Sequence, residues 1–174
     1  MNTISPARIY YREYGSGLSL IFLHGGWGYE VYPFNQQIAV LADRFRILIP
    51  DRSGYGRSIK VDHLTVNFHQ RAASEMVEFL DALGIEKAIL WGHSDGAVIA
   101  ALMGLMQPSR CLGLILEACH YYRAKPNSQE FFQTAVFEPE MFGPEICRIL
   151  ALEHGEPYWR KLLEYHGRAW LNLA

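Results

Sequence analysis

The chain has 174 residues, of which 50% are hydrophobic and 13% aromatic, and its formal net charge is −2 at pH 7. A chain of this length and composition can bury the core of one compact domain, which excludes a disordered protein. The slight negative charge excludes the basic surface typical of nucleic-acid-binding proteins, so we expect no nucleic-acid partner.

Nothing in the chain predicts membrane insertion, export or metal binding. The longest apolar stretch, residues 97–106, is about half of the roughly 20 residues that a membrane span needs. The first six residues lack the basic and apolar regions of a secretory signal. Cys111, Cys119 and Cys147 are odd in number and lack metal-type spacing, so we interpret them as reduced thiols of a cytoplasmic protein. No metal-ligand set or cofactor motif is present, and we expect neither group.

Strand-like and helix-like segments alternate along the first 120 residues. Apolar or β-prone runs predict strands at residues 9–14, 18–23, 45–49, 88–91 and 111–118. Helical spacing of apolar residues predicts helices at residues 32–41, 68–83 and from 97 to the close at Gln107. This alternation predicts an α/β fold with a mostly parallel sheet and helices on both faces.

The character of the chain changes after His120. From residue 127 onward there is no strand signal, and breaks at 138–139, 142–144 and 155–157 divide the segment into helical stretches. The last helical stretch, 158–173, carries one stripe that consists of Leu162, Leu163, His166, Ala169, Trp170 and Leu173.

The pentapeptide Gly-His-Ser-Asp-Gly at residues 92–96 follows a strand and opens a helix. This is the G-x-S-x-G nucleophile elbow, in which a tight turn lifts the hydroxyl of Ser94 above the sheet. The neighbours two residues away must lack bulk, which explains Gly92 and Gly96. The nucleophile position carries Ser94 and not Asp95, which argues against a nucleophilic-aspartate dehalogenase or epoxide hydrolase.

Two further motifs precede the elbow: His-Gly-Gly-Trp at 24–27 and Asp-Arg-Ser-Gly-Tyr-Gly-Arg-Ser at 51–58. With these three motifs in this order, the chain resembles the α/β-hydrolase superfamily, in its branch of small esterases, lactonases and carbon–carbon bond hydrolases. The resemblance implies an oxyanion hole formed by the backbone N–H groups of Gly26 and Asp95, with Trp27 as the alternative first donor.

The resemblance also implies a division into a hydrolase core at 1–120 and a partial helical cap, or lid, at 121–174. The family's triad acid usually follows the seventh strand and its histidine the eighth. Because no strand-like segment follows residue 120, we expect the last strands, and with them this acid and histidine, to be missing from the chain.

His120 is the candidate base within these residues, because it follows a strand at the sheet edge where α/β sites assemble. Glu117 could orient it only if the strand end bends. Near the same strand ends, Trp27, Tyr121 and Tyr122 are candidates for substrate binding. The remaining histidines divide into three expected groups: structural His24 and His93, solvated His63 and His69, and partly exposed cap residues His154 and His166.

The sequence therefore predicts a serine hydrolase that cleaves small carboxylic esters or related acyl compounds through a Ser94 acyl-enzyme. One alternative is a catalytically incomplete fragment that only binds or self-associates. The strand 111–118 would then be an unpaired sheet edge, which favours a homodimer through this edge or through the cap. A third possibility is that two chains complete one site, with a histidine donated across the interface.

Overall fold

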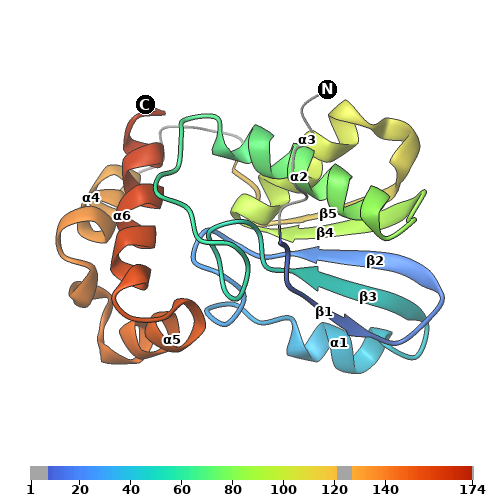
Figure 1. Ribbon diagram of the computed structural model, residues 1–174, viewed down its shortest axis with the longest axis horizontal. Helices are drawn as coiled ribbons and strands as arrows, with labels where there is room; N and C mark the ends of the chain where they lie inside the picture. Colours follow the sequence, from blue (N-terminus) through green and yellow to red (C-terminus); the bar gives the residue numbers. More distant parts are fainter. Residues whose placement is uncertain (1–7, 121–126, 174) are drawn as a thin grey trace.

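A five-stranded sheet forms the centre of the molecule, in a computed structural model that describes residues 8–120 and 127–173 (Figure 1). The strands lie in the order β1-β3-β2-β4-β5, and only β1 runs antiparallel to its neighbour. Their bounds are β1 Tyr11–Tyr14, β2 Leu18–Leu23, β3 Phe45–Pro50, β4 Ala88–His93 and β5 Cys111–Glu117. The predicted mostly parallel sheet is confirmed.

Helices cover both faces of this sheet, as the alternating pattern predicts. On one face, α2 (Phe68–Ala82) and α3 (Asp95–Met106) pack against the strands, and α1 (Asn35–Leu41) covers part of the other face (Figure 1). Side chains of β2 alternate between the two cores, because successive side chains of a strand point to opposite faces. Ile21 lies in the core under α2 and α3, and Phe22 lies in the core beside α1.

Within residues 127–173 the structure contains only helices and their connections. A short 3₁₀ turn outside this part, η1 (Pro108–Arg110), precedes β5. The helices of this part are α4 (Ser128–Phe137), α5 (Pro144–His154) and α6 (Tyr158–Leu171), and the 3₁₀ turn η2 (Pro139–Phe142) lies between α4 and α5. They gather at the end of the sheet where the parallel strands finish (Figure 1). A small apolar cluster joins α5 to α6: Leu150, Trp159 and Leu163.

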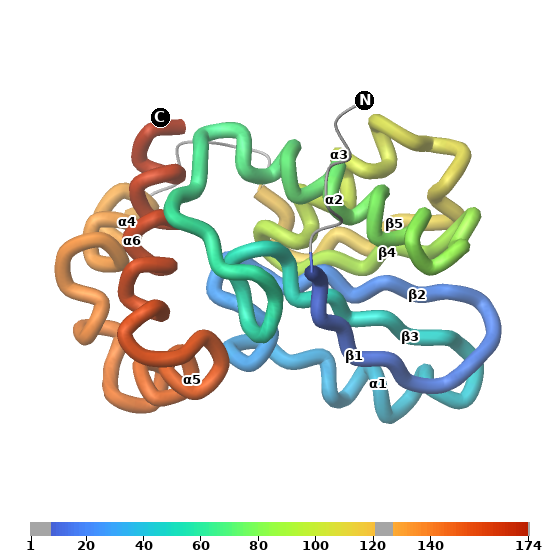
Figure 2. Tube along the Cα trace, in the orientation of Figure 1, coloured from blue at the N-terminus to red at the C-terminus, as the bar shows by residue number. Residues whose placement is uncertain are grey.

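The segment between β3 and α2 lies beside the helical part of the chain, as the Cα trace shows (Figure 2). The Gly56 N–H donates to His154 Nδ1 at 2.9 Å, and the Val61 N–H donates to the Tyr158 hydroxyl at 3.1 Å. Polar contacts thus connect this loop to α5 and α6.

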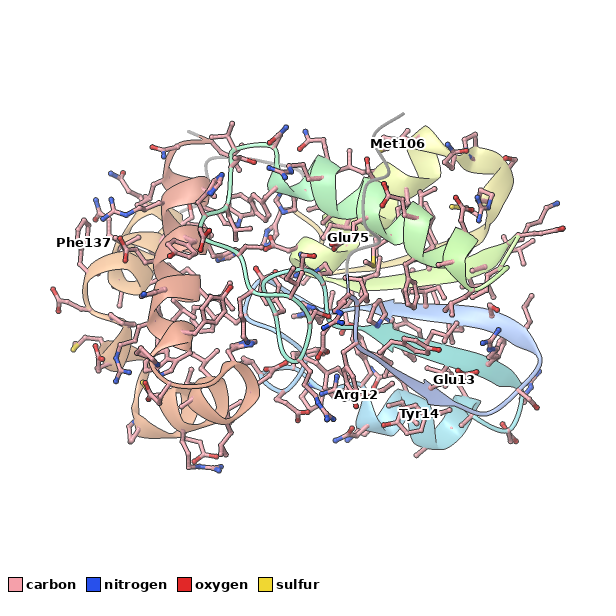
Figure 3. All side chains as sticks on the ribbon, viewed as in Figure 1. Arg12, Glu13, Tyr14, Glu75, Met106 and Phe137 are labelled. Carbon is pink, nitrogen blue, oxygen red and sulfur yellow. The ribbon has the colours of Figure 1, made fainter. Side chains whose placement is uncertain are left out.

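Exposed apolar side chains lie on both parts of the molecule. Figure 3 shows Met106 on α3 and Phe137 at the end of α4, far apart, with exposed fractions of 45% and 68%. Among the residues that the structure describes, every helix is too short or too polar to cross a membrane.

Candidate active site

Ser94 occupies the tight turn between β4 and α3 with φ 55° and ψ −118°. A positive φ is rare for a residue with a side chain and costs free energy, so the surrounding structure must hold it in place. A Cβ on Gly92 would overlap the carbonyl oxygen of Gly96, and a Cβ on Gly96 would overlap that of Leu23. The turn closes only because both glycines lack a side chain, as the sequence predicts for a nucleophile elbow.

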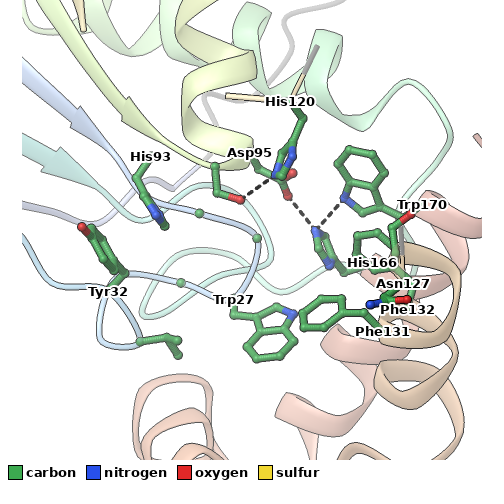
Figure 4. A pocket seen from close by; sticks show the side chains of 16 residues that line it. Trp27, Tyr32, His93, Asp95, His120, Asn127, Phe131, Phe132, His166 and Trp170 are labelled. Carbon is green, nitrogen blue, oxygen red and sulfur yellow. Dashed lines mark hydrogen bonds and ion pairs between the residues drawn. The ribbon is translucent and has the colours of Figure 1, made fainter. Parts of the chain in front are cut away.

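The Ser94 hydroxyl meets a histidine from the neighbouring strand. Ser94 Oγ lies 2.9 Å from His120 Nε2 (Figure 4). His120 follows β5, and Ala118 between them has a φ of 50°, which turns the chain after the strand. The Ser94 N–H also donates to the carbonyl oxygen of Glu117 at 2.9 Å, so β5 holds both partners of the pair.

The carboxylate of Glu117 has other partners. It accepts hydrogen bonds from the Tyr32 hydroxyl at 2.7 Å and from Trp91 Nε1–H at 3.3 Å. Tyr32 in turn stacks on His93, with 3.8 Å between the ring centroids. Glu117 therefore fixes the Tyr32 side of the site.

The loop after β2 is fixed by a buried arginine. Arg52 donates to the Gly25 carbonyl oxygen at 2.7 Å and to the His24 carbonyl oxygen at 3.2 Å. His24 is fully buried, and burial together with the charge of Arg52 lowers the pKa of its imidazole well below the usual value. His24 Nδ1 also lies 2.8 Å from the Gly25 carbonyl oxygen, so His24 and Arg52 together fix the backbone of Gly25 beside the elbow, which is the structural role expected from the sequence.

A cavity of about 470 Å³ opens over the Ser94–His120 pair, between the sheet end and the helices α4 and α6 (Figure 4). Trp27, one of the predicted substrate-binding residues, lines it and stacks on Phe131 at 5.1 Å. Phe132 and Trp170, also in the wall, stack on each other at 5.0 Å. The other two predicted substrate-binding residues, Tyr121 and Tyr122, lie outside the described residues.

Asp95 is fully buried and bonded to two histidines from distant segments. Its Oδ1 lies 3.0 Å from His69 Nε2, and its Oδ2 lies 2.6 Å from His166 Nε2. Burial alone would raise the pKa of Asp95, but its interactions with His166 and His69 outweigh burial and hold that pKa well below the usual range. Asp95 therefore carries a negative charge beside the cavity.

Three expectations about histidines are wrong. His69, His154 and His166 are buried, with exposed fractions of 6%, 2% and 3%, whereas His63 is exposed as expected. Each buried ring contacts a partner from another part of the chain, which the local sequence does not reveal. A signal for His166 did exist, because it falls on the apolar stripe of its helix.

A second group of buried polar side chains consists of Glu153 and His154, which are adjacent on α5. His154 accepts from the Gly56 N–H and lies 2.8 Å from the Trp27 carbonyl oxygen, so its neutral form donates from Nε2. Burial lowers the pKa of His154 to about 4. Burial raises the pKa of Glu153 to about 7, although the N–H groups of Tyr29 and Glu30 donate to its carboxylate at 2.7 and 3.1 Å. These contacts hold α5 against the loop after β2.

Among the described residues, no group of three or more His, Cys, Asp or Glu side chains is arranged to hold a metal ion. The contacts of Asp95 with its two histidines are direct hydrogen bonds between the side chains, which leave no space for an ion between them. The polar groups around the cavity include the Ser94 hydroxyl, the His120 imidazole and the carboxylate of Asp95.

Comparisons with known proteins bear on the family and the fold. A family model described as "alpha/beta hydrolase fold" matches residues 19–144. The bifunctional epoxide hydrolase 2 of Mus musculus is 35% identical over 113 residues, which cover 62% of this chain and 20% of the mouse protein. The pimeloyl-[acyl-carrier protein] methyl ester esterase of Pectobacterium carotovorum subsp. carotovorum (strain PC1) is 31% identical over 156 residues, which cover 84% and 57% of the two chains.

A solved structure of Est816, an N-acyl homoserine lactone degrading enzyme, superposes with a TM-score of 0.65 at 22% identity. The superposition covers 95% of this chain and 67% of the other. At this identity the likeness bears on the fold alone. The chain spans between a fifth and about three fifths of the length of the two relatives matched by sequence.

Proposed function

Because this chain belongs to the alpha/beta hydrolase family, we propose that it is a serine hydrolase that cleaves small, neutral carboxylic esters or lactones. The observation that carries the proposal is the 2.9 Å contact between Ser94 Oγ and His120 Nε2 at a strained elbow. A serine hydroxyl is a weak nucleophile without an adjacent base, and this contact supplies one.

In the proposed reaction, Ser94 Oγ attacks the ester carbonyl carbon while His120 Nε2 takes the hydroxyl proton. This requires the His120 tautomer that carries its proton on Nδ1. The tetrahedral oxyanion accepts hydrogen bonds from the N–H groups of Gly26 and Asp95. Asp95 is the first residue of α3, where the N–H groups have no acceptor within the helix.

Collapse of this intermediate expels the alcohol, which takes the proton from His120 and leaves the acyl group on Ser94. A water molecule then attacks the acyl carbon as His120 accepts its proton. The second intermediate expels Ser94, which recovers its proton from His120, and the carboxylic acid is released. Each proton that His120 accepts is returned within the same half-reaction, so the free enzyme is restored.

The cavity supports a neutral and apolar acyl or alcohol group. Its walls include the aromatic rings of Trp27, Phe131, Phe132 and Trp170, and its volume of about 470 Å³ suits a small organic molecule. The negative charge of Asp95 beside the cavity disfavours substrates that carry a carboxylate near the reacting carbonyl.

The proposal is tested by hydrolysis of p-nitrophenyl butyrate by the wild type, Ser94→Ala and His120→Gln. We expect both variants to lose at least about 10³-fold in kcat/KM, because each removes part of one catalytic unit. His63→Gln is a matched control, since His63 is exposed. Turnover that persists in Ser94→Ala would overturn the assignment of the nucleophile.

The alternative proposal is a non-catalytic protein that self-associates through β5. This strand is an edge of the described sheet, and Leu112, Leu114 and Ile115 on it have exposed fractions of 49%, 41% and 41%. An exposed apolar edge favours pairing with a second chain. Sedimentation velocity distinguishes the two proposals when it is combined with the ester assay: an inactive dimer supports self-association, and an active monomer contradicts it.

We also propose that the protein is cytoplasmic. Cys111, Cys119 and Cys147 are all unpaired. Free thiols suit a reducing compartment, which supports the cytoplasm.

A further inference from the structure

The buried carboxylate of Asp95 joins three segments that are far apart in the sequence. It belongs to α3, His69 belongs to the start of α2, and His166 belongs to α6. Figure 4 shows the contact of Asp95 with His166. The separations along the chain are 26 and 71 residues. The ester chemistry proposed above uses the backbone N–H of Asp95 but gives its carboxylate no role.

His166 is not available as a second base. Its Nε2 lies 2.6 Å from Asp95 Oδ2 and 3.2 Å from Trp170 Nε1. One nitrogen cannot donate to Asp95 and accept from Trp170 at once, and the shorter bond to a charged acceptor prevails. Its Nδ1 is buried and has no hydrogen-bond partner among the described residues. His166 Nε2 therefore donates to Asp95, and the base in contact with Ser94 Oγ is His120.

The Asp95–His166 pair lies directly against the oxyanion loop. A Cβ on Gly26 would overlap the His166 ring and would lie 2.6 Å from Asp95 Oδ2. Gly26 does not have a positive φ, so the glycine is required here by space and not by backbone conformation. The peptide of Gly26 thus rests on the pair without an intervening side chain.

We propose that the Asp95–His166 pair is a positioning clamp that sets the oxyanion hole and makes it depend on the docking of α6. The proposal rests on the serine hydrolase function proposed above. Both oxyanion donors are involved, because one is the backbone N–H of Asp95 itself and the other belongs to Gly26, which contacts the pair. If α6 moves away, the Gly26 peptide loses the surface on which it rests.

The decisive comparison is His166→Leu with His166→Gln. Leucine fills the volume of the ring but cannot donate to Asp95, whereas the glutamine amide reaches about as far as Nε2 and can donate. We expect His166→Leu to lower kcat by about 10–100-fold with KM changed by less than about threefold, because displaced oxyanion donors act on the transition state. We expect His166→Gln to stay within about threefold of the wild type.

Phenylboronic acid is the probe for the oxyanion hole, because its tetrahedral adduct with a serine mimics the intermediate. Its affinity should fall in His166→Leu by the same factor as kcat and should be retained in His166→Gln. Asp95→Asn keeps the side-chain volume but lacks one acceptor oxygen, and it should lose kcat and boronate affinity together. If His166→Leu does not fold, Asp95→Asn tests the proposal in its place.

Hydrogen exchange of the α6 amides gives a readout that does not depend on activity. Exchange should be faster in His166→Leu and Asp95→Asn than in the wild type. Arg168→Gln is the matched control on the same helix, because Arg168 is exposed and its side chain contacts Glu164 and, at 5.9 Å, the exposed ring of Phe137, but not Asp95 or His166. It should leave exchange, kcat and boronate affinity unchanged.

The outcomes separate the two proposals. If the wild type binds phenylboronic acid through Ser94 but the leucine and glutamine variants behave alike, the clamp is overturned and the serine hydrolase stands. If Ser94→Ala retains the turnover and boronate affinity of the wild type, the hydrolase proposal is overturned and the clamp with it. Loss in His166→Leu with rescue in His166→Gln supports the clamp.

Discussion

The sheet part of the molecule and its helical part are stabilised in different ways. In the sheet part, two apolar cores lie on the two faces of the strands. The helical part has a small apolar cluster of its own, against which Trp27 and Val31 pack. We call the interface between the two parts the joint. Besides this apolar packing, it contains polar contacts: His166 with Asp95, His154 with Gly56 and Trp27, Glu153 with Tyr29 and Glu30, and Tyr158 with Val61.

This difference has a consequence for how each part responds to change. Apolar packing depends little on pH, but a joint made of buried histidine and carboxylate groups depends on their protonation. The sheet part should therefore be sensitive to added volume, and the joint should be sensitive to pH and to the loss of single polar atoms.

The largest expected effect comes from adding one methyl group inside the sheet part. In Gly96→Ala the new Cβ would overlap the carbonyl of Leu23 and would lie 2.7 Å from that of His24. Both obstacles are backbone atoms that cannot rotate away. We expect a loss of at least about 4 kcal/mol in the free energy of unfolding, measured by urea denaturation. Gly113→Ala on β5 is the control, because its Cβ meets no atom within 4 Å.

Equal stability of these two alanine variants would contradict the rigidity that we assign to the elbow. Loss of soluble Gly96→Ala with normal Gly113→Ala would support it.

The second largest expected effect is a dependence of the free energy of unfolding on pH, through Glu153 in the joint. The pKa of Glu153 is raised to about 7, so the native state keeps a proton that the unfolded chain releases above a pH of about 4.5. Stability that depends on this group is full below pH 4.5 and is lost as the pH rises through 7. The loss amounts to about 3 kcal/mol, at about 1.36 kcal/mol per pKa unit.

Glu153→Gln cannot ionise, so its stability relative to the wild type should rise by about 3 kcal/mol between pH 4.5 and pH 8. Urea denaturation at a series of pH values measures this difference. Glu164→Gln on α6 is the surface control and should show a difference that stays within about 0.5 kcal/mol. A Glu153→Gln difference that does not change with pH would show that Glu153 is charged in the native state.

The same division explains what the sequence predicts and what it does not. The elbow is encoded within five residues, because the strand, Gly92, Gly96 and the helix follow one another along the chain. His120 could be chosen as a candidate since the end of a parallel strand places it at the site edge. The sheet and its helices likewise follow from local apolar periodicity.

The joint depends on partners that are distant in the sequence. His154 meets Gly56 across 98 residues, and His166 meets Asp95 across 71. A histidine in a helix is compatible with an exposed position until its partner is known, so these rings were expected at the surface. Only His166 carried a local hint, because it lies between Leu163 and Ala169 on the buried stripe of α6. The carboxyl group of Glu153 likewise has no local sequence signal of its burial.

The smallest expected effect comes from a substitution that removes one oxygen atom from the joint. In Tyr158→Phe the Val61 N–H loses its acceptor at 3.1 Å, and the Val61 carbonyl oxygen loses a longer contact with the same hydroxyl at 3.4 Å, so the N–H bond is the main loss. One hydrogen bond of this kind contributes about 1 kcal/mol, so the variant should remain folded. If the joint opens separately from the sheet part, hydrogen exchange should become about fivefold faster in α6 and stay unchanged in β2. Equal acceleration in both elements would instead mean that the two parts unfold as one cooperative unit, and the polar joint would then contribute to global stability like any core contact.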